Sequence, residues 1–214
     1  MSRIFLHIPH TSGRVLKEFI EKNRMKIEYV HNFYGLKAIR NKEYDTIYTI
    51  IRNPLDRAIS EYLHYSRLLM NQGYVNHLAL VKIRRERPFF NPAVPQDYFD
   101  LEENKNVMCK FLLRKTDFTK PVDNDDFKNV TTLINSGNIK YDTYSKINYK
   151  LPVFSKIIDW NVDTLKVAMD ELLSNYKETS SVVKKQLSNN VKLCEFIKKE
   201  NSYDFKLFDF MMNL

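Results

Sequence analysis

The side chains most suited to chemistry in this sequence are arginines, histidines and hydroxyl residues that follow short apolar segments. The first group lies in the turn PHTSGR (9–14), which comes after an apolar segment and before residues with the apolar spacing of a helix. Where a strand leads into a helix, the first amide groups have no intrahelical partner and the helix dipole adds positive charge, so the turn suits a phosphate or sulfate group. Gly13 lets the backbone come close to the anion. Further donors in the turn are the hydroxyls of Thr11 and Ser12 and the guanidinium of Arg14.

A second group begins where a segment rich in β-branched residues ends. Arg52 leaves the carboxyl end of this expected strand, which is the edge where open α/β sheets bind ligands. Ser60 lies two turns into the helix that follows, so the guanidinium of Arg52 and this hydroxyl could close on one phosphate. Arg57 on the same helix fits an ion pair with Asp56 or Glu61, or exposure to solvent, better than a role in the site.

The same two groups disfavour a magnesium-dependent nucleoside triphosphate site. Such a site would need G-x-x-x-x-G-K-[ST] at the first turn and an acidic residue at the end of a neighbouring strand. Here Arg14 follows the glycine and Arg52 stands at the strand end, so the sequence favours an anion site without a metal. The two cysteines, Cys109 and Cys194, match no metal-ligand spacing. They fit reduced structural thiols, which argues against a structural zinc site.

Composition and charge narrow the classes of protein that remain. The chain of 214 residues has 43% hydrophobic and 13% aromatic residues, which is enough for a core and excludes a mainly disordered state. The net charge is +8, and the excess lies in residues 1–87, with 16 Lys and Arg against 8 Asp and Glu. This basic part predicts an anionic partner. No apolar run has the length of a membrane span or a signal peptide, so we expect a soluble, cytoplasmic protein without a membrane partner.

The elements that would position these groups follow an α/β pattern. Strands are expected at 3–8, 26–31 and 45–51, with one helix in the segment TSGRVLKEFIEKN (11–23) and another that has Pro54 in its first turn and continues through 55–73. This order predicts a three-layer α/β fold, in which a central, mainly parallel sheet is flanked by helices. No linker or repeat interrupts the chain, so residues 1–214 are expected to form a single domain.

The second half of the chain is expected to be mainly helical. Helices are expected at 104–115, 123–136, 161–176, with Asn161 as a cap, and 202–214. Residues 74–96 contain three prolines and predict an ordered surface loop. The apolar segment LPVFSKIIDW (151–160) predicts a buried strand that leads into the helix after it.

The two groups of residues resemble the donor-binding motifs of a known family. IFLHIPHTSGRVLKEFI is similar to the phosphosulfate loop of sulfotransferases, a strand followed by P-K-T-G-G-T-S. IIRNPLDRAISEY is similar to their 3′-phosphate motif, R-D-P-x-x-R-x-x-S-x-Y. Within that superfamily the chain most resembles the carbohydrate enzymes of the uronyl 2-O-sulfotransferase type, and the likeness continues through residues 141–173 and the last helix. The resemblance implies the P-loop NTPase-like sulfotransferase fold.

The resemblance also implies a donor and a reaction. The donor would be 3′-phosphoadenosine-5′-phosphosulfate (PAPS), and its sulfuryl group would move to a hydroxyl of a glycan or a small acceptor, without a metal. The 5′-phosphosulfate would contact the loop residues His10, Thr11, Ser12, Gly13, Arg14 and Val15. The 3′-phosphate would contact Arg52 and Ser60.

A catalytic base is implied at His31. In the uronyl enzymes a histidine ends the second strand ahead of the 3′-phosphate arginine, and His31 occupies that position here. The chemistry agrees, because an alcohol must lose its proton as the sulfuryl group moves in line, and a histidine with an ordinary pKa of about 6.5 suits that role. Taken without the family, His31 is equally well explained as a plain residue at the end of a strand.

His10 departs from the family pattern, because it replaces the usual lysine of the loop. A lysine places a permanent charge against the leaving phosphate, whereas a histidine does so only when protonated. Either the bound anions keep His10 charged, or Arg14 takes over part of this catalytic role, or the enzyme is slow or inactive. Of the other histidines, His7 is expected to be a hydrogen-bonded core residue, and His64 and His77 are expected to have no catalytic part.

Two other functions stay open. A chain with His10 in the loop could bind the adenosine bisphosphate without catalysing transfer. The basic and aromatic residues of 82–90 could instead bind a polyanion or nucleic acid. A solvated charged loop explains them equally well, and nucleic acid is the less expected partner. No motif in the chain encodes the acceptor or the oligomeric state.

Overall fold

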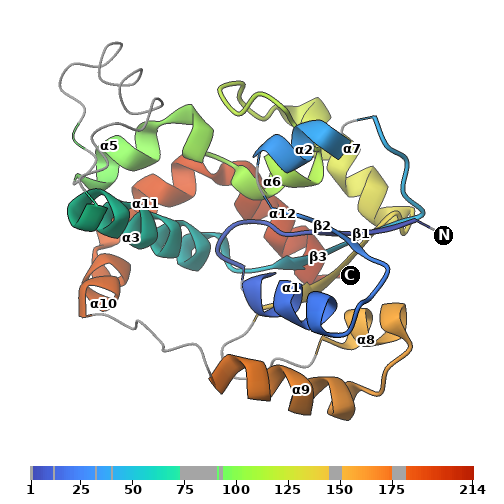
Figure 1. The fold of residues 1–214 in the computed structure, drawn as a ribbon. Helices are drawn as coiled ribbons and strands as arrows, with labels where there is room; N and C mark the ends of the chain where they lie inside the picture. Colours follow the sequence, from blue (N-terminus) through green and yellow to red (C-terminus); the bar gives the residue numbers. More distant parts are fainter. Residues whose placement is uncertain are drawn as a thin grey trace.

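A four-stranded parallel sheet lies at the centre of the molecule (Figure 1). The computed structural model describes residues 2–11, 13–31, 33–39, 41–72, 91, 94–144, 151–174 and 182–214. The strands are β1 (Arg3–Leu6), β2 (Glu28–Val30), β3 (Thr46–Ile51) and β4 (Ile139–Thr143), in the spatial order β2-β1-β3-β4. Each strand pairs with its neighbour in parallel, so the carboxyl ends of all four meet at one edge. The expected parallel sheet is confirmed.

Helices cover both faces of the sheet, which gives three layers (Figure 1). One face is covered by α1 (Gly13–Lys22), α8 (Pro152–Ile158) and α9 (Val162–Ser174). The other is covered by α2 (Phe33–Ile39), α6 (Val107–Leu112), α7 (Asn124–Asn135) and α12 (Ser202–Met212). Another group extends beyond the sheet and consists of α3 (Pro54–Gln72), α5 (Pro95–Asp100), the 3-10 helix η1 (Glu102–Asn104), α10 (Val182–Asn189) and α11 (Val191–Glu200).

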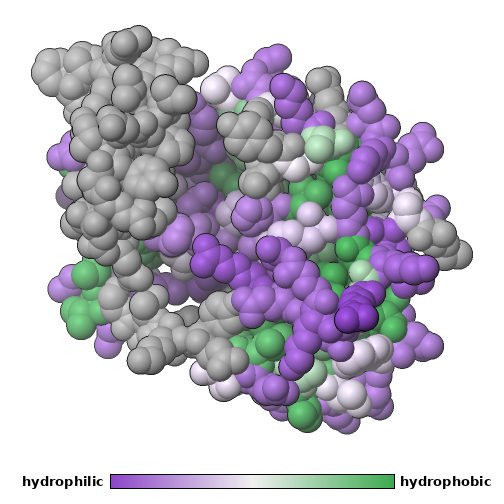
Figure 2. All heavy atoms as spheres, viewed as in Figure 1, coloured by the Kyte–Doolittle hydropathy of each residue, from purple (hydrophilic) through white to green (hydrophobic). Residues whose placement is uncertain are grey.

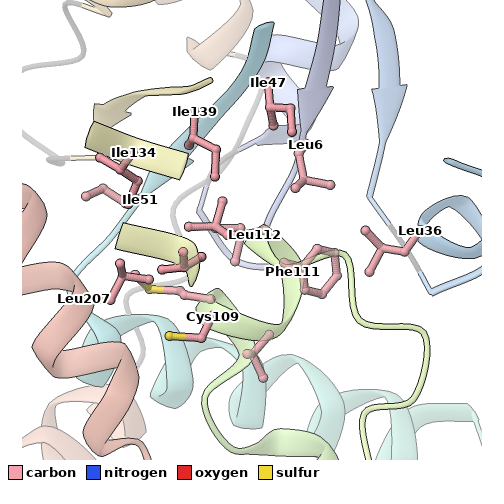
Figure 3. Close-up of a cluster of buried hydrophobic side chains, with 14 of the residues drawn as sticks. Leu6, Leu36, Ile47, Ile51, Cys109, Phe111, Leu112, Ile134, Ile139 and Leu207 are labelled. Atoms are coloured by element: carbon pink, nitrogen blue, oxygen red, sulfur yellow. The ribbon is translucent and has the colours of Figure 1, made fainter. Parts of the chain in front are cut away.

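Alternate side chains of the strands build a separate core on each face. Ile4 and Leu6 of β1 pack on the side of α2, α6, α7 and α12, where Leu112 joins them (Figure 3 labels Leu6 and Leu112). Phe5 lies between them in sequence and belongs to the opposite core, together with Phe154 of α8. Successive residues of a strand point to opposite faces. Burial on both faces therefore explains why β1 and β3 are almost continuously apolar in sequence.

The segment 151–160 contains helix α8 and is not the buried strand that its apolar residues predicted. Asp142 in β4 accepts hydrogen bonds from the amide groups of Val153 (3.0 Å) and Phe154 (2.9 Å). It thus satisfies two amide groups that have no partner inside the helix. Pro152 stands at the first helical position, where its fixed φ is favourable. The apolar density of the segment comes from one buried helix face, which includes Phe154.

Most of the other expected elements are present. The helices expected at 104–115, 123–136, 161–176 and 202–214 appear as the shorter α6, α7, α9 and α12. The predicted cap of α9 is confirmed, because Asn161 Oδ1 accepts a hydrogen bond from the amide of Asp163 at 2.8 Å. Strand β4 was not predicted, since Lys140 and Asp142 interrupt its apolar pattern. Helices α2, α10 and α11 were not predicted either.

Figure 2 shows hydrophilic residues over much of the face that it draws, with hydrophobic residues among them. Large exposed apolar side chains include Val167, Val182 and Val191. Within the described ranges, no helix combines the length and the apolar character that crossing a membrane requires. The expected loop at 74–96 falls mainly outside the described residues, and α5 begins at Pro95.

Candidate functional site

Three strand ends bring His7, His31 and Arg52 to the carboxyl edge of the sheet. His7 directly follows β1, which lies between the other two strands, while His31 follows β2 and Arg52 follows β3. The turn after β1 leaves the sheet at this edge and leads into α1. The candidate site is therefore built around this turn, with a β3 side and a β2 side.

On the β3 side, Arg52 faces the turn. Its Nη1 donates a hydrogen bond to the carbonyl oxygen of His10 at 3.1 Å. The side chain is buried, and its guanidinium lies 5.0 Å from the centre of the Tyr144 ring. His10 has a φ of 66°, in the left-handed region that residues other than glycine rarely adopt. The bond from Arg52 helps to hold this conformation and puts the two sequence motifs in direct contact.

The backbone of the turn is fixed from within. Thr11 is fully buried, and its hydroxyl donates a hydrogen bond to the carbonyl oxygen of Ile8 at 2.7 Å. The hydroxyl proton of Thr11 is thus already used in building the turn, so the role expected for it as a donor to an anion does not fit this arrangement. Ser12, the other expected hydroxyl donor, lies outside the described residues.

At the start of α1, a close contact with His7 requires glycine. The amide of Gly13 donates a hydrogen bond to Nε2 of His7 at 3.2 Å. A Cβ atom added to Gly13 would lie 2.1 Å from Cδ2 of His7, inside the van der Waals contact distance. Next in the chain, the amide groups of Arg14 and Val15 have no acceptor among the described residues. With the positive end of the helix dipole, these two amides offer a place for an anion.

Helix α3 turns one face towards the site. Arg57, Ser60 and His64 are three and four residues apart and so lie on the same face of the helix. The His64 ring is 5.3 Å from the His10 ring, which places this face against the turn. Ser60 is half-buried between the other two residues along the helix. Arg57 is fully buried and pairs with Glu61 at 2.7 Å, so the predicted ion pair is confirmed and solvent exposure is not.

The β3 side concentrates positive charge around a neutral imidazole. The pKa of His10 is lowered to about 3, mainly by burial and then by the charges of Arg57, His64, Arg52 and Arg14. His10 is therefore uncharged at pH 7 in the protein alone. Because Arg57 is already paired with Glu61, the guanidinium groups of Arg52 and Arg14 are the charges that favour an anion on this side.

On the β2 side, His31 is exposed and lies beside a hollow of about 550 Å³ between α1 and the end of β2. Arg14, Lys17, Tyr29 and His31 contribute to its lining. Burial, Lys17 and Arg14 lower the pKa of His31, so the ring is neutral at pH 7. No described residue forms a hydrogen bond with it. A neutral, accessible imidazole has the form that a proton acceptor needs.

His7 connects the two sides and is the hydrogen-bonded core residue that the sequence predicted. It is 5% exposed, and its Nδ1 lies 2.6 Å from the hydroxyl of Tyr29. Its ring centre is 5.8 Å from that of His31. Burial, followed by the charges of His31, His10 and Arg14, lowers the pKa of His7 to about 3.

Sequence reasoning missed two residues of the site. The sequence pattern predicts only a strand at Tyr29, although this residue stands two positions before His31 and so faces the same side of β2. The pattern gives His64 no role, although it stands seven residues after Arg57 on a face that points to the turn. Helical spacing from Arg57 and Ser60 was the signal that could have drawn attention to His64.

In the part of the chain that the structure describes, no three His, Cys, Asp or Glu side chains gather as a metal site. Comparison with family models, with curated proteins and with solved structures finds no match for this chain. The functional argument therefore depends on the geometry of the site.

Proposed function

We propose that this protein is a sulfotransferase of the carbohydrate type, similar to the uronyl 2-O-sulfotransferases, with 3′-phosphoadenosine-5′-phosphosulfate as its donor. One observation carries the proposal: the hydrogen bond from Arg52 to the carbonyl of His10. It joins the two motifs that would bind opposite ends of one nucleotide. The three-layer arrangement around a parallel sheet is compatible with the fold that such enzymes have.

The donor would bind along the turn and helix α3. Its 5′-phosphosulfate would accept hydrogen bonds from the amide groups of Arg14 and Val15, supported by the helix dipole. Its 3′-phosphate would bind near the buried guanidinium of Arg52, with Ser60 on the facing helix as a hydroxyl donor. The excess positive charge near His10 supports this placement, because a nucleotide with two anionic ends would neutralise it.

Transfer would need only positioning, electrostatic stabilisation and one proton acceptor. The acceptor hydroxyl would attack sulfur, a new oxygen–sulfur bond would form, and the bond from sulfur to the bridging oxygen would break. The electron pair of that bond would leave with adenosine 3′,5′-bisphosphate. His31 would take the proton of the hydroxyl. Arg14 at the helix start would supply the charge that stabilises the leaving phosphate, since His10 is neutral.

A second candidate function is nucleotide binding without catalysis. The low pKa of His10 favours it, because the loop then lacks the permanent charge that a lysine would supply. The two candidates agree on the nucleotide site and differ in turnover. They are therefore separated by transfer to an acceptor and not by binding.

The test combines titration calorimetry with adenosine 3′,5′-bisphosphate and transfer of a radiolabelled sulfuryl group to a panel of uronic-acid glycans and small alcohols. The proposal predicts saturable nucleotide binding and labelled product. Binding without product supports the second candidate. No nucleotide binding overturns both, and DNA binding that the nucleotide does not displace would then support a polyanion module. Arg24→Ala, an exposed arginine beyond the other end of α1, is the matched control for lost charge.

A further inference from the structure

A chain of hydrogen bonds from Gly13 through His7 ends at Tyr29, which lines the hollow on the β2 side, and the direction of these bonds is fixed. The amide of Gly13 can only donate, so Nε2 of His7 must carry a lone pair to accept its bond at 3.2 Å. A neutral His7 then has its proton on Nδ1. That proton lies towards the hydroxyl oxygen of Tyr29, 2.6 Å away, and Tyr29 is the acceptor of this bond.

This direction determines what the Tyr29 hydroxyl can still do. Because its oxygen accepts from His7, its own proton is left for another partner. No described residue accepts that proton. Tyr29 also helps to line the hollow of about 550 Å³. Burial raises the pKa of Tyr29, so the hydroxyl keeps its proton at neutral pH and acts as a donor towards the hollow.

His31 offers the complementary group on the same wall. Its ring centre is 5.7 Å from the Tyr29 ring, and both side chains line the hollow. Among the described residues, none bonds to the His31 ring, so its unprotonated nitrogen has no partner within the described part of the chain. The wall thus offers one fixed donor and one acceptor close together. An alcohol has the matching pair, because its oxygen accepts one hydrogen bond while its proton is donated to another group.

We propose that the acceptor hydroxyl is held between Tyr29 and His31, with Tyr29 donating to its oxygen and His31 receiving its proton, and that His7 is the positioning residue that orients Tyr29. This inference rests on the proposed sulfuryl transfer and adds to it a second residue that contacts the acceptor. As the new oxygen–sulfur bond forms, the proton of the hydroxyl moves to His31. The bond from sulfur to the bridging oxygen breaks, and its electron pair leaves with adenosine 3′,5′-bisphosphate. Tyr29 keeps its own proton throughout.

The first experiment replaces Tyr29 by Phe, which removes only the hydroxyl. We expect kcat/KM for the acceptor to fall about tenfold, the size of one hydrogen bond, mainly through KM. The affinity for adenosine 3′,5′-bisphosphate should stay within about twofold, because Tyr29 is not part of the nucleotide site. Tyr203→Phe is the matched control, since it also removes a hydroxyl with one hydrogen bond, to Asn124, on a distant helix. An unchanged kcat/KM in Tyr29→Phe overturns the inference and leaves the proposed function intact.

A second experiment determines which ring nitrogen of His7 carries the proton, and it does not require sulfuryl transfer. Nitrogen-15 NMR of histidine-labelled protein should show the ring of His7 with its proton on Nδ1, and Tyr29→Phe should shift that nitrogen resonance while Tyr203→Phe does not. A proton on Nε2 overturns the chain of bonds, whether or not the protein binds nucleotide. Failure to bind nucleotide overturns the proposed function, and binding without transfer to any alcohol overturns the acceptor role of Tyr29.

Discussion

The two sides of the turn after β1 differ in charge, burial and hydrogen bonding. On the β3 side, the buried guanidinium of Arg52 holds the carbonyl of His10, and Arg57 adds a second buried charge. On the β2 side, His31 is exposed, and Tyr29 is linked to His7 by a bond between neutral groups. The first arrangement suits tight binding of an anion, and the second suits the handling of a proton. Under the proposed function, one short turn would separate nucleotide binding from proton transfer.

The difference follows from the position of each strand end in the sheet. β3 lies inside the sheet, between β1 and β4. Helix α3 follows β3 in the chain and covers the site on this side. Arg52 is consequently buried, and its charge is weakly screened. β2 is an edge strand, so His31 at its end remains open to solvent. Under the proposed function, this location would let His31 exchange its proton with solvent after each transfer.

The largest expected effect is the loss of sulfuryl transfer when the proton acceptor on the β2 side is removed. We expect His31→Ala to reduce sulfuryl transfer about 10² to 10⁴-fold, because a positioned base contributes that much to proton removal. The affinity for adenosine 3′,5′-bisphosphate should not change, since His31 lies on the other side of the turn. Initial rates and calorimetry on the same preparation provide the measurement. A parallel loss of nucleotide affinity would show that the two sides are not separate.

The corresponding substitution on the β3 side is Arg52→Ala. We expect the Kd for adenosine 3′,5′-bisphosphate to rise roughly 10 to 100-fold, because bonds from a charged donor contribute about 1.5–3 kcal/mol. The nitrogen resonances of His7 and His31 should stay unchanged. Arg52→Lys should recover part of the affinity, and Arg24→Ala should have no effect. An unaltered Kd in Arg52→Ala would exclude the β3 side as the nucleotide site.

Two substitutions at His7 test separately its two hydrogen bonds, one with Tyr29 and one with the amide of Gly13. His7→Asn places an amide donor near the position of Nδ1 and keeps a partner for Tyr29, whereas His7→Gln places an acceptor near Nε2 and keeps a partner for Gly13. We expect His7→Gln to raise the acceptor KM about tenfold, as loss of one hydrogen bond would, with little change for His7→Asn. Steady-state kinetics measures the acceptor KM of the two variants. Equal KM values would mean that His7 has only a structural role.

The smallest expected effect is a change in the pH dependence of stability. Unfolded His7 has an ordinary pKa of about 6.5, while folded His7 stays neutral down to about pH 3. The unfolded chain therefore binds more protons in this range, and the free energy of unfolding falls as the pH decreases from about 6.5 towards 3. His7→Gln should reduce the slope by up to about 1.4 kcal/mol per pH unit. Urea unfolding at several pH values measures it, and an identical slope would contradict a neutral, buried His7.

Much of the framework was accessible from local patterns in the sequence. The segment that ends at Ile51 was recognised as a strand by its β-branched residues, and α3 by Pro54 at its first turn. Both features depend on residues close together in the chain. The helix α8 and strand β4 were missed for the opposite reason. Asp142 looks unsuited to a buried strand until Tyr48, 94 residues away, donates to it at 2.6 Å and the amides of α8 complete its bonds.

For the candidate site, the order of residues along the chain was enough to place His7, His31 and Arg52 at one edge, because parallel strands share the direction in which they end. Chain order could not assign the protonation states. The neutral His10 results from burial beside Arg52, 42 residues away, and the oriented Tyr29 hydroxyl results from a bond to His7, 22 residues away. Desolvation and hydrogen-bond direction depend on which distant groups meet, so tertiary structure alone decided which charged groups are buried and which imidazole can accept a proton.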